Sequence, residues 1–381
     1  MNYIDRLVAE LCPDGVEYRP LGELLAYEQP TKYLVSSKDY DESYPTPVLT
    51  AGKTFILGYT NETEGIYPAS EEEPVIIFDD FTTAFKWVEF PFKAKSSAMK
   101  MLTLKSGTNS LFKYVYYAMQ CIVYNSSDHA RQWISKYSNI EIPVPPLEIQ
   151  EAIVEILDKF TNLEAELEAE LEARTLQYEY YRDSLFEALD CPRVPLGSLG
   201  IRNKGITITA SKMRTLEPGN KDVRIFAAGS TFIDTDSSFI PDKGILEGPA
   251  IIVKSRGYIG FEYYEGKFTH KNELWSYSLT SDLVEQKFIY YYLLTQAYHL
   301  HELARGKSVK LPQLAVKDTD ELLVPVPSLE EQQRIVDILD RFDALTSSLS
   351  EGLPAELAAR RSQYEYYRDQ LLTFPRKGEN Q

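Results

Sequence analysis

The sequence lacks the features of secreted, disulfide-bonded and membrane-spanning proteins. Only three cysteines occur in 381 residues, Cys12, Cys121 and Cys191, and they stand far apart, with no C-x-x-C pair and no histidine cluster. This usage argues against a disulfide framework and against a structural zinc site. No apolar run approaches the roughly 18 residues of a membrane helix, and the N-terminus has no signal-peptide pattern. We therefore expect a cytoplasmic protein with no membrane partner.

Positive charge is also scarce. The chain has 40 Lys and Arg residues against 57 Asp and Glu residues, a net charge of −17, whereas neutralisation of phosphates normally drives nucleic-acid binding. The acidic excess is uneven, however. Segment 148–187 has 3 basic and 12 acidic residues and segment 329–372 has 5 and 9, whereas segment 188–328 has 17 and 16. Most of the acidity therefore lies in two segments, and it does not exclude DNA as a partner.

What the chain does contain is a long internal repeat. Residues 142–160 read IPVPPLEIQEAIVEILDKF and residues 324–342 read VPVPSLEEQQRIVDILDRF, with 12 of the 19 positions identical. The block QYEYYRD occurs unchanged at 177–183 and at 363–369. Fainter matches upstream, such as PVII at 74–77 with PAII at 249–252, keep offsets of 174 to 177. Self-similarity at a fixed period indicates one scaffold that has been duplicated.

Each half of the chain divides into a β-rich part and a helical part. Short alternating runs rich in Tyr, Phe, Thr, Ile, Gly and Pro predict strands, with short helices near 111–119 and 288–300. Apolar residues three or four apart predict a long helix in each second part. We expect an α+β fold in which two similar β-rich globular domains with short helices are separated by two long antiparallel helices. These helices would form a coiled-coil-like spacer with an internal pseudo-two-fold repeat.

The repeat also predicts where the parts begin and end. The expected bounds are 1–146 and 188–328 for the two β-rich domains, 147–187 and 329–375 for the two spacer helices, and 376–381 for a tail. The residues expected to form the apolar stripe of the spacer are Ile153, Ile156, Leu157, Phe160, Leu163, Leu167, Leu171, Ile335, Ile338, Leu339, Phe342 and Leu345.

The repeated segments carry a family resemblance. The two (I/V)PVPxLExQ…IVxILD(K/R)F segments and the two QYEYYRD blocks each follow a variable domain, and this pattern spans essentially the whole chain. The sequence thereby resembles the specificity subunit of type I restriction–modification enzymes. The resemblance implies that the variable domains are target recognition domains, each binding one half of a split double-stranded DNA sequence. Because the two domains have diverged, we expect an asymmetric target.

The resemblance also implies partners. It implies that the helices form a spacer that docks two methyltransferase (modification) subunits, with restriction subunits in the full complex. This chain would then be non-catalytic and would bind no cofactor itself. S-adenosylmethionine, ATP and Mg would be bound by the partner subunits.

The spacer has a length signal of its own. A helix of about 40 residues is roughly 60 Å long, and half-sites read from one face of DNA lie about 34–36 Å apart. The first helix carries the tetrapeptide repeat LEAE-LEAE-LEAR at 163–174, which the second helix lacks. We interpret the number of these tetrapeptides as a ruler for the gap between half-sites, against the simpler interpretation of a segment with good helix propensity.

Polar residues in loops that follow predicted strands are the candidates for DNA contact. Arginine can bind guanine through two hydrogen bonds, and lysines, hydroxyls and amides bind phosphates and base edges. Arg256 and Arg305 are our candidates for guanine, and the acidic Asp79 and Asp80 must face away from DNA or accept from cytosine. The full candidate set is Lys93, Lys95, Ser96, His129, Arg131, Gln132, Lys254, Arg256, Lys271, Asn272, Arg305, Lys307 and Lys310.

Other interpretations remain beside this one. The tyrosines Tyr178, Tyr181, Tyr364 and Tyr367 could stack on bases, but helix packing is favoured because they lie on the spacer. A carboxylate–lysine arrangement around Asp242 and Glu265 only superficially matches a metal-dependent nuclease, and the sequence has neither a P-loop nor an adenine-methyltransferase motif. The alternative from another class is a coiled-coil scaffold with two protein- or glycan-binding modules.

Overall fold

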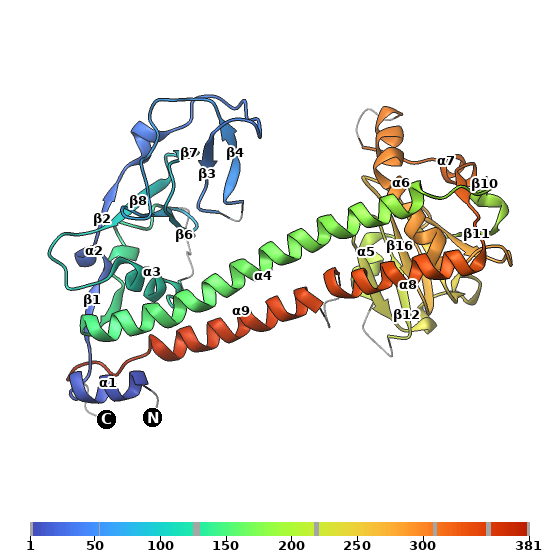
Figure 1. The fold of residues 1–381 in the computed structure, drawn as a ribbon. Coiled ribbons are helices and arrows are strands. Elements are labelled where there is room, and N and C mark those ends of the chain that lie inside the picture. Colours follow the sequence, from blue (N-terminus) through green and yellow to red (C-terminus); the bar gives the residue numbers. More distant parts are fainter. Residues whose placement is uncertain are drawn as a thin grey trace. The chain divides into compact units, whose positions relative to one another are not determined.

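The protein consists of two compact units that share one long helix. The structure, a computed structural model, describes residues 3–52, 54–124, 130–216, 221–307, 311–347 and 352–378. Unit 1 comprises residues 1–166 and 357–381, and unit 2 comprises residues 167–356. Helix α4 (Leu147–Glu187) is continuous and contributes its first half to unit 1 and its second half to unit 2 (Figure 1). No helix in the described part of the chain is long and apolar enough to span a membrane.

The two units have closely similar sheet topologies, which confirms the predicted repeat, and unit 2 has one additional strand, β14, in its second sheet. Each has a four-stranded antiparallel sheet, a second sheet in which two strands pair in parallel, and a short antiparallel pair beside the long helices. In unit 1 the strand orders are β2-β8-β5-β6, β4-β3-β7 and β1-β9, and in unit 2 they are β11-β18-β15-β16, β13-β12-β17-β14 and β10-β19.

The strand and helix bounds follow the chain. In unit 1 the strands are β1 (Glu17–Pro20), β2 (Leu25–Glu28), β3 (Thr46–Leu49), β4 (Ile56–Thr60), β5 (Val75–Asp79), β6 (Phe85–Val88), β7 (Lys93–Ala94), β8 (Met99–Leu104) and β9 (Glu141–Val144), and the short helices are α1 (Tyr3–Leu11), α2 (Leu21–Leu24) and α3 (Phe112–Gln120). In unit 2 the strands are β10 (Arg193–Pro195), β11 (Gly200–Lys204), β12 (Val223–Phe226), β13 (Phe232–Thr235), β14 (Leu246–Glu247), β15 (Ala250–Arg256), β16 (Tyr258–Tyr264), β17 (Lys267–His270), β18 (Trp275–Leu279) and β19 (Leu323–Pro325), and the helices are α5 (Ala210–Thr215), α6 (Gln286–Gly306), α7 (Val316–Asp320) and α8 (Leu329–Thr346). The last helix is α9 (Gly352–Leu371).

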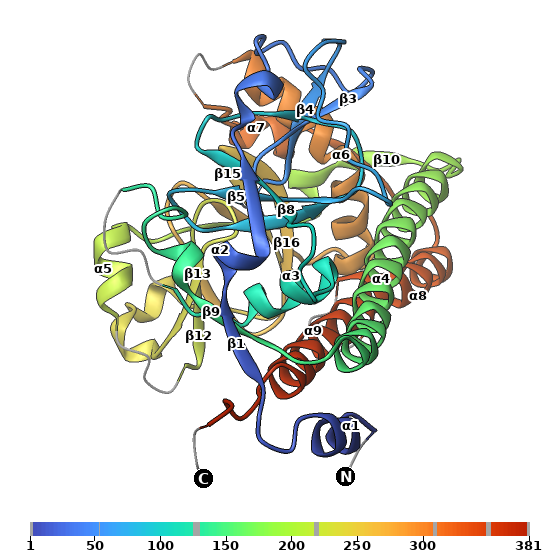
Figure 2. The same cartoon turned by 90° about the vertical axis from the view of Figure 1, so that its left-hand side faces the viewer.

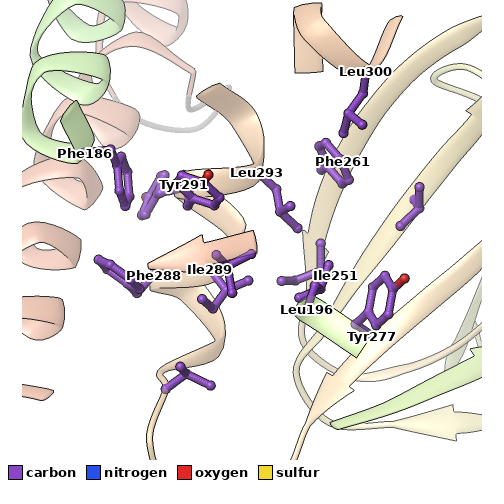
Figure 3. Close-up of a cluster of buried hydrophobic side chains, with 14 of the residues drawn as sticks. Phe186, Leu196, Ile251, Phe261, Tyr277, Phe288, Ile289, Tyr291, Leu293 and Leu300 are labelled. Atoms are coloured by element: carbon purple, nitrogen blue, oxygen red, sulfur yellow. The ribbon is translucent and has the colours of Figure 1, made fainter. Parts of the chain in front are cut away.

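The central strand of each unit is buried on both faces. Successive side chains of a strand point to opposite sides, so Ile251 packs toward α6 while Ile252 packs toward the second sheet. In β5 the same division holds for Ile76 and Ile77. Burial on both faces explains why these strands are continuous apolar runs instead of alternating ones. The core between α6 and the sheet of unit 2 is shown in Figure 3, where Phe186 of α4 also points toward α6.

The first turns of α4 and α8, the two helices that begin in the repeated segments, belong to the cores of units 1 and 2, respectively. On α4, Ile153 and Leu157 are fully buried in the core of unit 1, and on α8, Ile335 and Leu339 are fully buried in the core of unit 2. These four residues therefore attach each helix to its own β-rich domain, which corrects their assignment to the spacer. Ile156, Leu163, Leu167, Leu171 and Ile338 are half-buried.

The ends of the repeated helices pair across the two repeats. In unit 1, Phe160 of α4 stacks on Tyr367 of α9 with ring centroids 5.6 Å apart. In unit 2, Phe342 of α8 stacks in the same way on Tyr181 of α4, at 5.8 Å. Tyr364 and Tyr178 make the matching second contacts with the two phenylalanines. The QYEYYRD blocks therefore serve helix packing, as the sequence favours. Helices α4 and α9 run antiparallel in unit 1, since Glu164, after Phe160, pairs with Arg361, before Tyr367.

The second repeated helix is interrupted where the first is continuous. Helix α8 ends at Thr346 and α9 begins at Gly352, so the predicted helix at 329–375 is two helices. Gly352 has φ +73°, and a Cβ there would lie 2.5 Å from the carbonyl oxygen of Ala344. Only glycine adopts this conformation without strain. Leu345, which the sequence assigns to the spacer, lies in the last turn of α8 and is 37% exposed.

The glutamine that both repeats share fixes the start of each helix to its domain. Gln150 Nε2 donates to the carbonyl oxygens of Pro145 (2.7 Å) and Asn109 (3.2 Å), and its Oε1 accepts from Leu111 N (2.9 Å). Gln332 makes the equivalent set of three hydrogen bonds in unit 2. Both side chains are fully buried, so each satisfies backbone groups that have no helical or sheet partner.

The segment before β1 and the segment after α9 lie side by side in unit 1. Val16 N donates to Pro375 O (2.8 Å) and Lys377 N donates to Val16 O (2.9 Å), so the segment after α9 runs beside the segment before β1. Both views show α1 close to this C-terminal segment (Figure 1, Figure 2). Phe374 is buried in the same core as Ile4 and Leu7 of α1.

Candidate nucleic-acid interface

In unit 2, three loops meet at the carboxyl end of β15, a central strand of the four-stranded sheet. Ser255 Oγ donates to the carbonyl oxygen of Glu273, which ties the loop before β18 to the β15–β16 hairpin. Leu314 N donates to Ser255 O (2.9 Å) and Gly257 N donates to Pro312 O (2.9 Å), which tie the segment after α6 to the same hairpin. We call these three loops the unit 2 loop cluster, and its residues are 256–258, 271–274 and 311–314.

Unit 1 has the same arrangement at the equivalent strand. Asp80 N donates to Ala98 O (2.9 Å), and Gln132 N donates to Asp80 O (2.8 Å). Asp80 precedes Ser255 by 175 residues, and Ala98 precedes Glu273 by the same 175, so the repeat offset matches both partners. We call these loops the unit 1 loop cluster, and its residues are 80–84, 95–98 and 130–133.

The unit 2 loop cluster presents exposed side chains that suit DNA. Arg256 and Asn272 are exposed, and the neighbouring Tyr258 is 69% exposed. In the described part of the chain no carboxylate pairs with Arg256, so its guanidinium is available. Arg305 is exposed in the last turn of α6 and forms an ion pair with Glu302, with 3.7 Å between nitrogen and oxygen. Four predicted contact residues thus lie on or beside one end of unit 2, counting Lys271.

Two of the predicted cations are present but paired. Lys271 Nζ lies 2.7 Å from Glu273, and its side chain is mostly buried. Lys307 Nζ lies 2.5 Å from Asp318, which also accepts from Ala315 N at the start of α7. These pairs reduce the positive charge that either lysine offers to a phosphate.

The unit 1 loop cluster contains fewer free cations. Arg131 is exposed and has no acidic partner among the described residues. Lys95 is half-buried and donates to Tyr40 Oη (2.7 Å), and Ser96 Oγ accepts from Ala98 N (3.1 Å) to close a turn. The structure therefore brings these three candidates together, but of the two cations only Arg131 is exposed, since Lys95 is half-buried against Tyr40.

Three of the predicted DNA contacts are wrong because their side chains are buried. Lys93 pairs with Glu62 at 2.6 Å, and Lys254 pairs with Glu262 at 3.1 Å, with both lysines under 5% exposed. Gln132 is fully buried and accepts from Tyr124 Oη (2.7 Å). A sequence shows a lysine near a strand end, but it does not show that the long stem folds back into the domain. His129 and Lys310 lie outside the described residues.

The two acidic residues of the unit 1 hairpin bind groups of their own domain and shape the loop. Asp79 Oδ1 accepts from Phe81 N (3.0 Å) and Thr82 N (2.8 Å), which closes the turn. Asp80 is 1% exposed, pairs with the fully buried Lys100 at 3.0 Å and accepts from Trp133 N (2.8 Å). No local pattern in the sequence indicates this ion pair, which helps to fix two of the three loops in the unit 1 cluster.

The histidine beside the unit 2 loop cluster carries no charge near neutral pH. His270 is fully buried, and its Nε2 lies 3.1 Å from Ser276 Oγ. Burial lowers the pKa of His270 to about 4, so the neutral imidazole predominates at pH 7. The positive charge of this end of unit 2 therefore comes from lysine and arginine alone. Among the described residues, no three His, Cys, Asp or Glu side chains are placed to hold a metal ion.

Comparison with known proteins finds one family over both units. A family model described as type I restriction modification DNA specificity domain matches residues 13–173 and again 220–359. The chain is 43% identical over 407 aligned positions to the Escherichia coli type I restriction enzyme EcoR124I/EcoR124II specificity subunit, covering 99% of this chain and 98% of that protein. It is 27% identical to a putative type I specificity subunit of Haemophilus influenzae, covering 94% of this chain and 96% of that one.

A solved structure agrees with the fold. The crystal structure of a type I restriction–modification S subunit from M. genitalium superposes with a TM-score of 0.58 at 17% identity, covering 94% of this chain and 96% of that one. At this identity the similarity concerns the fold, including the two β-rich domains and the long helices.

Proposed function

Because the chain belongs to the family of type I restriction–modification DNA specificity subunits, we propose that each of its units reads one half of an asymmetric, bipartite DNA target. The observation that carries this proposal is the pair of loop clusters. They lie at equivalent ends of two domains with closely similar topologies, yet they present different side chains. Equal scaffolds with different contact residues are what two unlike half-sites require.

The chain would act without catalytic residues of its own. On this proposal, methyl transfer and cleavage take place on partner subunits, where S-adenosylmethionine, ATP and Mg²⁺ bind. The long helices would dock two methyltransferase subunits, and restriction subunits would join in the full complex. The assembly would work in the cytoplasm, where the DNA of the host is found.

DNA recognition can be tested with the chain in complex with its modification subunits. We expect the complex to shift duplex DNA selectively from a random library, with a binding constant that falls steeply as salt rises. Enriched duplexes should share two separate specific blocks with an unspecific gap of constant length. A complex that assembles but shifts no DNA at any salt concentration would support the alternative, a coiled-coil scaffold for protein or glycan ligands.

The proposed gap function of the helices predicts the effect of a deletion. Removing residues 167–170 shortens α4 by one tetrapeptide, which is about 6 Å and slightly more than one turn. Base pairs rise about 3.4 Å each, so we expect the gap between the half-sites to shorten by about one or two base pairs. Both half-site sequences should stay the same. Sequencing of methylated adenines in a host that expresses the system measures the gap directly.

The control for this deletion keeps the helix length. Glu172 is exposed in the same stretch of α4, and Glu172→Gln changes charge without changing length. We expect this variant to methylate the parental target. A deletion variant that methylates with the parental gap would contradict the gap function while leaving DNA recognition by the two units intact.

A further inference from the structure

We propose that each unit reads adjacent base pairs with two side chains at matched positions of its loop cluster, Arg256 with Gln313 in unit 2 and Phe81 with Arg131 in unit 1. This inference rests on the proposed DNA recognition and names the side chains that set its specificity. Three of the four are polar groups able to bind base edges. Gln313 and Phe81 were not among the residues that the sequence singled out.

The pairing in unit 2 is set by the backbone. Arg256, the last residue of β15, forms an antiparallel bridge with Gln313. Residues directly opposite each other in such a bridge project to the same side, with Cβ atoms about 5 Å apart. Both side chains are exposed. A guanidinium and a carboxamide therefore stand next to each other at the end of the domain.

The equivalent pair in unit 1 follows from the hydrogen bonds. Gln132 N donates to Asp80 O just as Leu314 N donates to Ser255 O, so Gln132 corresponds to Leu314. Arg131 precedes the donor Gln132 as Gln313 precedes the donor Leu314, so these two residues correspond. Phe81 follows the acceptor Asp80 as Arg256 follows the acceptor Ser255, so these two correspond as well. Arg131 is exposed and Phe81 is 40% exposed, although Phe81 is a large apolar side chain.

The chemistry of the four side chains suggests what each reads. Arginine binds O6 and N7 of guanine with two hydrogen bonds, glutamine binds N6 and N7 of adenine, and a phenylalanine contacts the thymine methyl group. Neighbouring base pairs are about 3.4 Å apart, which two side chains about 5 Å apart can span. The half-site of unit 2 would then contain a guanine read by Arg256 next to an adenine read by Gln313. The half-site of unit 1 would contain a guanine read by Arg131 next to a thymine contacted by Phe81.

We favour these residues over their neighbours for two reasons. The two arginines have no acidic partner among the described residues, whereas Lys271 and Lys307 are paired with carboxylates. The backbone under each pair is fixed by hydrogen bonds between loops. In unit 1 the buried ion pair of Asp80 and Lys100 adds to this support. A side chain that is preorganised in this way loses less entropy when it binds a base edge.

Substitution of Arg256 tests the inference. In the complex with modification subunits, we expect Arg256→Ala to lower discrimination at one guanine position of one half-site by roughly 10-fold or more. Arg256→Lys should keep most of the affinity but lose the same discrimination, because an ammonium group lacks the two-pronged geometry. The other half-site should be unchanged. Arg131→Ala should give the reciprocal result, with relaxed specificity confined to the other half-site.

The matched control is Lys317→Ala, which removes an exposed cation of α7 that pairs with Glu321 at 3.5 Å. Its target should be parental. Selection from a random duplex library and sequencing of methylated adenines both measure the outcome, and circular dichroism verifies folding. Equal weakening on all sequences by Arg256→Ala would make Arg256 a phosphate contact and overturn the inference. Failure of the unsubstituted complex to select any sequence would instead overturn the proposed function.

Discussion

Replacement of Lys100 by methionine is expected to lower the free energy of unfolding of unit 1 by about 3–5 kcal/mol, because it leaves a buried carboxylate without its countercharge. Lys100 is fully buried between Asp80, at 3.0 Å, and Gln29, whose Oε1 accepts from Nζ at 3.1 Å. Methionine fills much of the space of the lysine stem, so the loss reports the charge more than a cavity. Urea unfolding followed by circular dichroism measures the change.

A second substitution separates the charge from the packing. Asp80→Asn combined with Lys100→Met removes both charges and keeps an oxygen that can accept from Trp133 N. We expect the double variant to be more stable than Lys100→Met alone. The matched control is Lys86→Met, since Lys86 is exposed on β6 of the same sheet. If Lys100→Met unfolds at the same urea concentration as Lys86→Met, the buried ion pair does not support the loop cluster.

Replacement of Gln332 by leucine is expected to destabilise unit 2 by about 3 kcal/mol or more. The amide accepts from Glu285 N (2.8 Å) and donates to the carbonyl oxygens of Leu283 (2.8 Å) and Pro327 (2.9 Å). Leucine makes none of these bonds, and each buried group left without a partner costs about 1–3 kcal/mol. Urea unfolding of the full chain measures the loss.

The next residue provides the control for this substitution. Gln333 is exposed, and within the described part of the chain its amide donates to Asp337, one turn further along α8, at 2.8 Å. Gln333→Leu should therefore change stability by less than about 0.5 kcal/mol, as surface substitutions usually do. Because Gln150 makes the same three bonds in unit 1, Gln150→Leu should destabilise as Gln332→Leu does. Equal stability of the two α8 variants would show that the glutamine is not what fixes this helix to the domain.

The repeat made the fold predictable to a large extent. Apolar residues three and four apart locate α4, and the duplicated segment places a second helix at α8. The break between α8 and α9 was harder to predict, although Gly352 and Pro354 are both visible in the sequence. A glycine in a helical run is tolerated at a cost, and only its positive φ against the carbonyl of Ala344 shows that it starts a new helix here.

The candidate site was predicted less well, for a geometric reason. Lys254 and Arg256 lie two residues apart on β15, so both side chains point to the same side of the sheet. On that side Phe226 covers Lys254, since Nζ of Lys254 lies 4.9 Å from the centroid of the Phe226 ring. The side chain of Arg256 is not covered and is exposed. Where the covering layer ends is a tertiary property that no local pattern records. The repeat offset of 175 residues could have been used to align Asp80 with Ser255, and thereby Phe81 with Arg256.

The aromatic contacts at the helix ends have a consequence for how such a chain could have arisen. Phe160 and Tyr181 belong to one repeat, and Phe342 and Tyr367 to the other, yet each phenylalanine stacks on the tyrosine of the opposite repeat. One repeat alone therefore holds both halves of the contact but cannot close it on itself. Two identical copies related by a two-fold axis would satisfy both contacts at once, as isologous interfaces do. A gene that encoded a single repeat could thus have yielded a working homodimer, and fusion of two copies would have freed each to evolve its own target.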